Sequence, residues 1–246
     1  MRRRFFVSQF DEGAASAVIE GQAAHHLGRV LRAQRGQLYE LSDGAKVYLG
    51  RIATVSRDRI DFTLEEEIPS YQQAVEMSLL LSIVKFDAFE WALEKATELG
   101  VAAIVPVAAA RSERALMAAA GKRAERWGKI IAEAAQQSRR LRAPKLLEVT
   151  RPGQAFGGHA ARKIMLSERI GAPALREVLG REPLAGEAIR AGEAILAIGP
   201  EGGWTEEEFE LALGAGFQEA SLGKLILRTE TAVIAALASL NYALGT

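Results

Sequence analysis

The stretch Ala194–Thr231 admits few architectures. Its first five residues, Ala194–Ile198, form an apolar run typical of a strand buried in a sheet. Three glycines within Gly199–Gly203 then predict a loop that a ligand can approach closely. Thr205 stands three residues before Glu208, which is the spacing of a capping box and predicts a helix start. This order of elements favours a ligand at the carboxyl edge of a parallel sheet.

A second loop of the same kind follows. Glu219–Leu222 predicts a short strand, Gly223 interrupts it, and the chain then enters a long apolar helix at Glu230–Leu244. The glycines leave the backbone of these two loops accessible, which suits a small organic ligand held by backbone hydrogen bonds. The first loop, Gly199–Gly203, fits neither a Walker A motif nor G-x-G-x-x-G, so a Rossmann dehydrogenase is disfavoured. A plain tight turn is the alternative for this loop.

The rest of the chain predicts two domains. Residues 1–70 carry several short strand patterns and a helix at Ala23–Leu31, which favour a small β-barrel. The polar, proline-containing segment 65–76 predicts the boundary. Residues 74–246 alternate between strands and helices, which predicts an α/β domain with a parallel sheet. Its predicted strands include 77–84, 101–107 and 163–166. The last helix is apolar nearly all round, which favours a dimer.

Composition excludes several kinds of site. The chain of 246 residues has no cysteine, so disulfides, thiolate zinc sites and a cysteine nucleophile are excluded. His25, His26 and His159 lack metal-ligand spacing, and we expect no metal. We find no apolar run long enough for a signal peptide or a membrane span, so we expect a cytoplasmic protein without a membrane partner.

Positive charge is concentrated in two segments although the net charge is zero. Between Arg111 and Lys145 ten Lys and Arg residues face three Glu residues, and six arginines face three acids in the first 36 residues. A neutral protein with basic segments can bind a polyanion such as RNA through them. A solvated helix face is the other interpretation of such a run.

Three charged residues stand beside the two predicted ligand loops: Glu201, Arg228 and Glu230. A cation such as Arg228 at this place stabilises an oxyanion in a catalytic site, or holds a phosphate or carboxylate without a catalytic role. Glu201 and Glu230 are candidate proton acceptors, so we assign all three as candidate catalytic residues.

These motifs carry a family resemblance. GPEGG at Gly199–Gly203, followed by LGKLILRTETA at Leu222–Ala232, resembles the C-terminal signature of the SPOUT class of methyltransferases. The stretches HHLGRVLR at His25–Arg32, RSER at Arg111–Arg114 and ERWGKIIAEAAQQSRR at Glu125–Arg140 extend the likeness along nearly the whole chain. The chain is most similar to the bacterial family that methylates N3 of a uridine in 16S ribosomal RNA.

The resemblance implies a fold, a cofactor and partners. Residues 1–70 would form a PUA-like RNA-binding β-barrel, and residues 74–246 a SPOUT methyltransferase domain with a C-terminal trefoil knot. The cofactor would be S-adenosylmethionine, and the substrate 16S rRNA or the small ribosomal subunit. The protein would be a homodimer that associates through its C-terminal helix.

The resemblance also implies site residues. Those expected to bind the cofactor are Leu166, Ile198, Gly199, Pro200, Gly202, Gly203, Leu222, Gly223, Leu227, Arg228, Thr229, Glu230 and Thr231. Those expected to bind RNA are Arg3, Arg4, Arg29, Arg32, Arg111, Arg114 and Arg140. The chain departs from the family pattern at Trp204, Phe86, Gln136 and Arg139.

Two alternatives remain open from the sequence. The protein could be an RNA-binding assembly factor that keeps the cofactor fold without activity. It could also be a related SPOUT enzyme that methylates transfer RNA or a ribose 2′-hydroxyl. Cofactor binding and the position of the transferred methyl group separate these possibilities.

Overall fold

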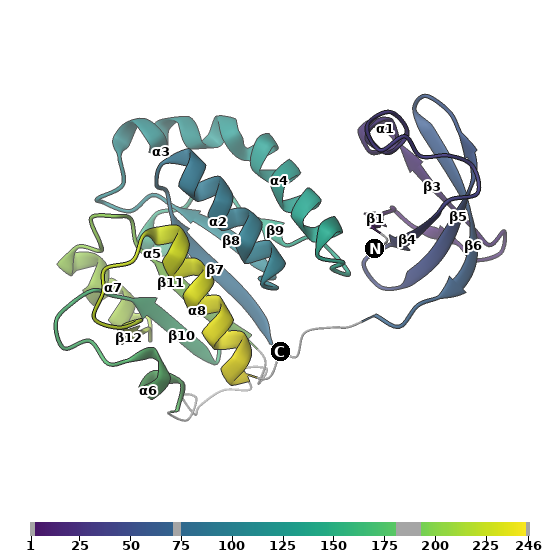
Figure 1. Cartoon of the computed structure of the whole chain (residues 1–246). Helices are drawn as coiled ribbons and strands as arrows, with labels where there is room; N and C mark the ends of the chain where they lie inside the picture. The colour runs from purple at the N-terminus through teal and green to yellow at the C-terminus, as the bar shows by residue number, and fades with distance from the viewer. Residues whose placement is uncertain (1–2, 71–74, 181–192, 245–246) are drawn as a thin grey trace. The chain divides into compact units, whose positions relative to one another are not determined.

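The computed structural model describes residues 3–70, 75–180 and 193–244. The chain divides into two compact units, each with its own sheet (Figure 1). The first unit comprises Met1–Gln72 and Ala135–Ala143, and the second comprises Gln73–Ala134 and Pro144–Thr246. The short segment Ala135–Ala143 therefore groups with the N-terminal sheet, although the sequence analysis assigns it to the C-terminal domain.

The first unit is built on a six-stranded sheet with the order β1-β4-β5-β6-β3-β2. The β1–β4 pair is parallel and the other pairs are antiparallel. Alternate residues such as Leu41, Ile52 and Phe62 form its core. Within the described residues no pairing of β1 with β2 closes the sheet, so the barrel stays a prediction. The strands are β1 (Arg4–Phe6), β2 (Phe10–Asp11), β3 (Ser16–Glu20), β4 (Leu38–Ser42), β5 (Val47–Val55) and β6 (Arg59–Glu67).

Two sequence-based boundaries in this unit change. The predicted helix Ala23–Leu31 is a short α-helix, α1 (Gly21–His25), followed by a π-helical turn, η1 (His26–Val30). Strand β6 continues through Glu67, into the segment predicted as a connection. Its acidic end is accommodated because Arg51 pairs with Glu65 across the hairpin. Residues 71–74 of the predicted connection lie outside the described residues.

The second unit confirms the predicted α/β fold with a parallel sheet. Its six strands pair in the order β12-β10-β11-β7-β8-β9, and every pair is parallel. Apolar runs such as that of β11 suit this sheet because both of its faces are covered. The strands are β7 (Glu76–Ser82), β8 (Ala103–Val107), β9 (Lys145–Leu146), β10 (Arg162–Leu166), β11 (Glu193–Ile198) and β12 (Gln218–Ala220).

Helices pack on both faces of this sheet. Leu80 of β7 joins a core cluster with Phe156 and Trp204, whereas the adjacent Leu79 and Leu81 point to the opposite face. Helices α2 (Phe86–Glu98) and α8 (Thr229–Leu244) pack against each other, and α5 (Pro152–Ala155) packs on α7 (Glu206–Gly214). The remaining helices are α3 (Arg114–Ala120), the 3₁₀ turn η2 (Gly121–Arg123), α4 (Ala124–Gln137) and α6 (Leu175–Leu179).

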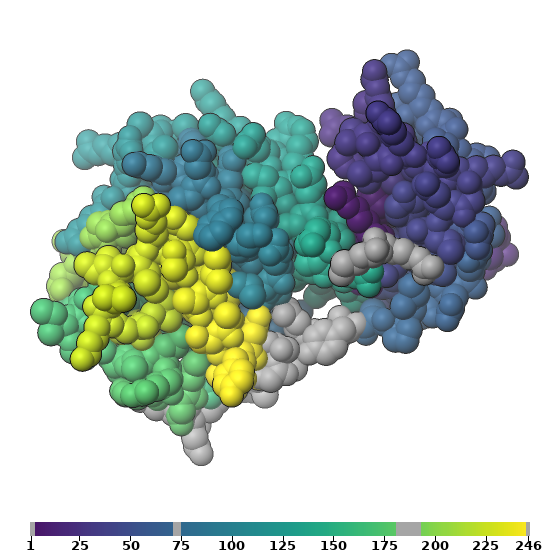
Figure 2. All heavy atoms as spheres, viewed as in Figure 1, coloured from purple at the N-terminus to yellow at the C-terminus, as the bar shows by residue number. Residues whose placement is uncertain are grey.

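Helix α8 is only partly covered. Val233, Leu237 and Leu240 are buried, but Tyr242 near its C-terminal end is 93% exposed. The space-filling view shows α8, in yellow, lying open at the surface (Figure 2). No helix in the described parts of the chain has the length and apolar character needed to cross a membrane.

Candidate functional site

Three loops meet at the carboxyl edge of the second sheet. They follow β10, β11 and β12, which are neighbours in the sheet, and they enclose a cavity of about 300 Å³ together with the start of α8. This volume lies at the small end of the range of roughly 300–1,000 Å³ that is typical of small-molecule sites. The arrangement places the two predicted ligand loops in one pocket, and it adds a third loop.

Most residues assigned to the cofactor line this cavity. They are Leu166, Ile198, Gly199, Pro200, Gly202, Gly203, Leu222, Gly223, Leu227 and Thr229, and the candidate proton acceptor Glu201 lies there too. Arg228, Glu230 and Thr231 are not among the lining residues. The Arg228 side chain is exposed where the loop enters α8. The binding and catalytic roles of these residues stay predictions.

The sequence analysis missed part of the wall. Ser167, Glu168 and Arg169 line the cavity directly after β10. Their position could have been predicted from the strand at 163–166, because residues that follow neighbouring parallel strands gather at one edge of a sheet. Arg111, which the sequence analysis assigns to RNA, also lines the cavity, and no local pattern indicates that position.

The glycine-rich loop is fixed at both ends. The predicted capping box is present, since Thr205 Oγ1 accepts from the Glu208 backbone N–H and Glu208 Oε2 accepts from the Thr205 N–H. Thr229 Oγ1 donates to the Gly199 carbonyl at 3.5 Å, which joins the loop to α8. Gly203 has φ of +68°, a conformation that favours glycine. The loop is therefore a preformed backbone surface.

Trp204 forms the rigid wall behind this loop. Its side chain is buried and packs edge-on against Phe156, with ring centroids 5.7 Å apart. A Cβ at Gly199 would lie 3.1 Å from the indole nitrogen of Trp204. The tryptophan thus fills the space that any side chain at position 199 would need.

Replacement of Thr205 by alanine tests the cap. We expect Thr205→Ala to lower the free energy of unfolding by about 1 kcal/mol, because the Glu208 N–H loses its acceptor. Denaturant titration measures this change. Thr205→Ser keeps the hydroxyl and serves as the control, with stability close to that of the wild type. An alanine variant as stable as the serine variant would contradict the prediction.

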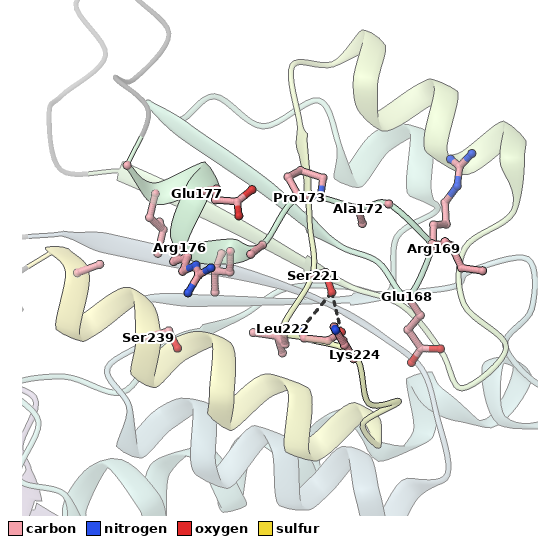
Figure 3. A pocket seen from close by; sticks show the side chains of 18 of the residues that line it. Glu168, Arg169, Ala172, Pro173, Arg176, Glu177, Ser221, Leu222, Lys224 and Ser239 are labelled. Carbon is pink, nitrogen blue, oxygen red and sulfur yellow. Dashed lines mark hydrogen bonds between the residues drawn. The ribbon is translucent and has the colours of Figure 1, made fainter.

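A wider, open cavity of about 1450 Å³ adjoins the first. The two cavities share Glu168, Arg169 and the segment 221–224. Figure 3 looks into the wider cavity, with Arg176 and Glu177 of α6 on one side and Ser239 of α8 on another. Ser221 Oγ accepts from the Gly223 N–H and donates to the Gly223 carbonyl, which holds the shared wall in a tight turn. Two adjoining cavities suit a transfer between two ligands.

The arginines assigned to RNA are not equivalent in the structure. Arg3, Arg29, Arg32 and Arg114 are exposed. Arg140 is partly buried, and burial together with the nearby charge of Arg142 lowers its pKa to about 10, so it remains protonated at neutral pH. These side chains retain the positive charge that phosphate contacts require.

Arg4 and Arg111 are engaged within their own units. Arg4 is buried, forms an ion pair of 3.0 Å with Glu40, and donates to the Arg139 carbonyl. Its guanidinium satisfies a buried carboxylate and is not presented to solvent, so we leave it out of the RNA-binding surface. Arg111 donates to backbone carbonyls of Gly202 and Trp204.

A buried carboxylate neutralises part of the positive charge of the basic segment Arg111–Lys145. Glu90 on α2 is buried and pairs with Arg126 at 2.7 Å and with Arg123 at 3.3 Å. Arg123 also lies over the ring of Phe86, one of the positions that departs from the family pattern. These two arginines join η2 and the start of α4 to α2, which leaves less of the charge excess available for a polyanion than the count implies.

The described residues contain no group of three or more His, Asp or Glu side chains placed to hold a metal ion. The charged groups at the cavity are instead Arg111, Glu168, Arg169, Glu201 and Lys224. Arg169 pairs with Glu206 at 3.4 Å and lies over the ring of Phe209. The other lining residues are glycines, apolar side chains and the hydroxyl residues Ser167, Ser221 and Thr229, a mixture that suits a small organic ligand.

Comparisons with known proteins identify the family of the chain. A family model described as an RNA methyltransferase domain matches residues 71–241. A ribosomal RNA small subunit methyltransferase E from Synechocystis is 32% identical over 235 residues, which cover 92% of this chain and 73% of the relative.

Two solved structures with similar folds are also methyltransferases. A crystal structure of a ribosomal RNA small subunit methyltransferase E from Neisseria gonorrhoeae, bound to S-adenosylmethionine, is 30% identical with a TM-score of 0.84 and covers 98% of both chains. A methyltransferase from Legionella pneumophila in complex with the same cofactor is 27% identical with a TM-score of 0.85, over 99% of this chain and 98% of that one.

Proposed function

Because the chain belongs to the ribosomal RNA small subunit methyltransferase E family, we propose that it methylates N3 of one uridine in 16S ribosomal RNA. The methyl donor is S-adenosylmethionine. The observation that carries this proposal is the 300 Å³ cavity in which the GPEGG loop and the LRTET segment meet at one sheet edge. The enzyme interpretation is favoured over a non-catalytic assembly factor because both loops line a formed pocket.

The residues of the cavity fit this donor. Gly199 and Gly203 line the cavity with backbone, and Leu166, Ile198 and Leu222 offer apolar surface to a flat base. When bound, S-adenosylmethionine supplies an electrophilic methyl group on a positively charged sulfur. The contribution of the chain is to hold this group in line with the acceptor, which lowers the entropic part of the barrier.

We place the acceptor base in the wider cavity, next to the wall that both cavities share. Uridine N3 must lose its proton, which leaves negative charge on the ring. Arg228 is the group that we assign to stabilise this charge, and Glu201 or Glu230 accepts the proton. Glu201 lines the smaller cavity beside the shared wall, and none of the three is among the residues that line the wider one. Lys224 and Arg176 border the wider cavity and add positive charge for the RNA backbone.

The remaining features of the family are part of the proposal. The first unit is the PUA-like RNA-binding barrel, residues 74–246 form the methyltransferase domain, and its C-terminal part forms a trefoil knot. The protein works in the cytoplasm, where its ribosomal substrate is assembled.

A homodimer through α8 is supported by the exposed Tyr242 and by Trp91 of α2, which is 43% exposed. Tyr242 also borders the wider cavity, so a partner on α8 would wall the acceptor site.

RNA binding should depend steeply on salt. Arg29, Arg32 and Arg114 are exposed cations in the two basic segments, and phosphate contacts release counterions from the RNA. We expect the affinity for 16S rRNA fragments to fall about 100-fold or more between 50 and 200 mM salt. Filter binding over a salt series measures the slope. Arg114→Ala should make the slope shallower by about one phosphate contact, and a slope near zero in the wild type would contradict the prediction.

The class of RNA that accepts the methyl group tests the function. Purified protein is incubated with labelled S-adenosylmethionine and with small ribosomal subunits, naked 16S rRNA or transfer RNA from cells that lack this activity. We expect label in 16S rRNA or in the small subunit. Label in transfer RNA would contradict the substrate and favour the related-enzyme alternative. Cofactor binding without any label would favour the assembly-factor alternative.

A further inference from the structure

Arg111 lies on the loop after β8, yet it contacts the glycine-rich loop. Its Nη1 donates to the Gly202 carbonyl at 2.8 Å and to the Trp204 carbonyl at 3.1 Å. Resting on the proposed function, we propose that Arg111 is a positioning residue for S-adenosylmethionine. It fixes the glycine-rich loop in the shape that binds the cofactor, and it does not act as an RNA phosphate contact.

The two carbonyls belong to peptide groups that are held at their other ends as well. The Gly203 N–H, in the same peptide group as the Gly202 carbonyl, donates to the Pro200 carbonyl at 2.8 Å. The Thr205 N–H, in the same peptide group as the Trp204 carbonyl, donates to Glu208 Oε2 at 2.8 Å. Arg111 therefore helps to fix the orientation of two peptide groups in the loop that lines the cofactor cavity.

Glu208 anchors the same contact from the other side. This carboxylate is buried, and its Oε1 accepts from the Ala110 N–H at 2.8 Å. Ala110 and Arg111 are consecutive, so the β8 loop is bound through one residue to the α7 start and through the next to the glycine-rich loop. These hydrogen bonds of Ala110, Arg111 and Glu208 thus join the β8 loop, the start of α7 and the glycine-rich loop to one another.

The stem of Arg111 contributes through packing. A Cβ built at Gly202 would lie 3.3 Å from Arg111 Cβ and 3.4 Å from Cδ, so the aliphatic stem covers this glycine closely. A lysine would keep the charge and part of the stem, but its nitrogen lies one atom closer to Cα than Arg111 Nη1, which donates to both carbonyls. We therefore expect Arg111→Lys to restore only part of the function that Arg111→Ala removes.

Calorimetry with S-adenosylmethionine tests the proposal on the full-length protein. We expect Arg111→Ala to weaken cofactor binding about 10- to 100-fold, with Arg111→Lys between it and the wild type. In steady-state kinetics the KM for the cofactor should rise by a similar factor, whereas kcat at saturating cofactor stays within about threefold. Affinity for 16S rRNA fragments and its salt slope should not change. Arg151→Ala, an exposed arginine in the same unit, is the matched control and should change neither affinity.

A second variant keeps the test decisive if Arg111→Ala unfolds. Glu208→Gln preserves size but turns an amide N–H₂ toward either the Thr205 or the Ala110 N–H, so we expect weaker cofactor binding with unchanged RNA affinity. Melting temperatures without cofactor identify variants that have merely lost stability. A drop in melting temperature with unchanged cofactor affinity in the folded protein would overturn the proposal.

The alternative role of Arg111 gives the opposite pattern. Reduced RNA affinity and a shallower salt slope with normal cofactor binding would show a phosphate contact and overturn the inference. If the wild type binds the cofactor and Arg111→Ala binds it equally well, the inference alone fails. If the wild type binds no cofactor, both the proposed function and the inference fail.

Discussion

Replacement of Arg228 by alanine is expected to lower the turnover number for methyl transfer about 100- to 1,000-fold, with less than about a threefold change in cofactor affinity. The reason is its position. Arg228 is exposed and is not among the residues that line the 300 Å³ cavity, so we expect cofactor binding to depend little on its side chain. In the proposal its guanidinium stabilises the negative charge that forms on the uridine ring as N3 loses its proton. Single-turnover rates at saturating cofactor measure the loss of transition-state stabilisation, and calorimetry measures affinity.

Arg228→Lys is the matched control for charge. It should retain more turnover than the alanine variant, because an ammonium group still stabilises an anion, although without the fork of arginine. Near-normal turnover in Arg228→Ala would contradict the catalytic role. A loss confined to cofactor or RNA affinity would instead make Arg228 a binding group.

Gly199→Val should abolish measurable cofactor binding, with a loss of about 100-fold or more. The branched side chain would enter the space of Trp204, whose indole nitrogen lies 3.1 Å from the Cβ position. Trp204 cannot withdraw because it is buried against Phe156, so the cost falls on the loop that forms the cavity. Calorimetry with S-adenosylmethionine measures the loss.

Gly214→Ala provides the control for Gly199→Val. Gly214 ends α7, and a Cβ there meets no atom within 4 Å, so we expect wild-type affinity. Combining Gly199→Val with Trp204→Leu should recover part of the binding, because the smaller side chain frees space beside residue 199. Unchanged affinity in Gly199→Val alone would mean that the glycine-rich loop does not hold the cofactor.

The features that the sequence predicts well are local. The apolar run of β11 and the capping box of α7 depend on neighbouring residues, and both are present as expected. The meeting of the two ligand loops follows from one general rule about parallel sheets, and the structure confirms that they share a cavity. Local pattern and this rule together locate most of the candidate site.

The features that the sequence does not predict depend on pairs far apart in the chain. Arg111 reaches a carbonyl 91 residues away, and its place in a basic segment favours a contact with RNA until that bond is seen. Arg4 likewise donates to the carbonyl of Arg139, 135 residues away. A count of charges along the sequence gives the number of arginines but does not show which of them are bonded to distant parts of the chain. The wider cavity is missed for the same reason, since α6, the Ser221–Lys224 turn and α8 form it jointly.

The identity of the methylated atom tests the central claim most directly. Small ribosomal subunits from cells without this activity are incubated with the protein and S-adenosylmethionine, and the 16S rRNA is then digested to nucleosides and fragments for mass spectrometry. The account predicts 3-methyluridine at a single position, formed at least about 100-fold more slowly when Arg228→Ala replaces the wild type. A methyl group on a ribose hydroxyl, on another base or at many uridines would contradict it.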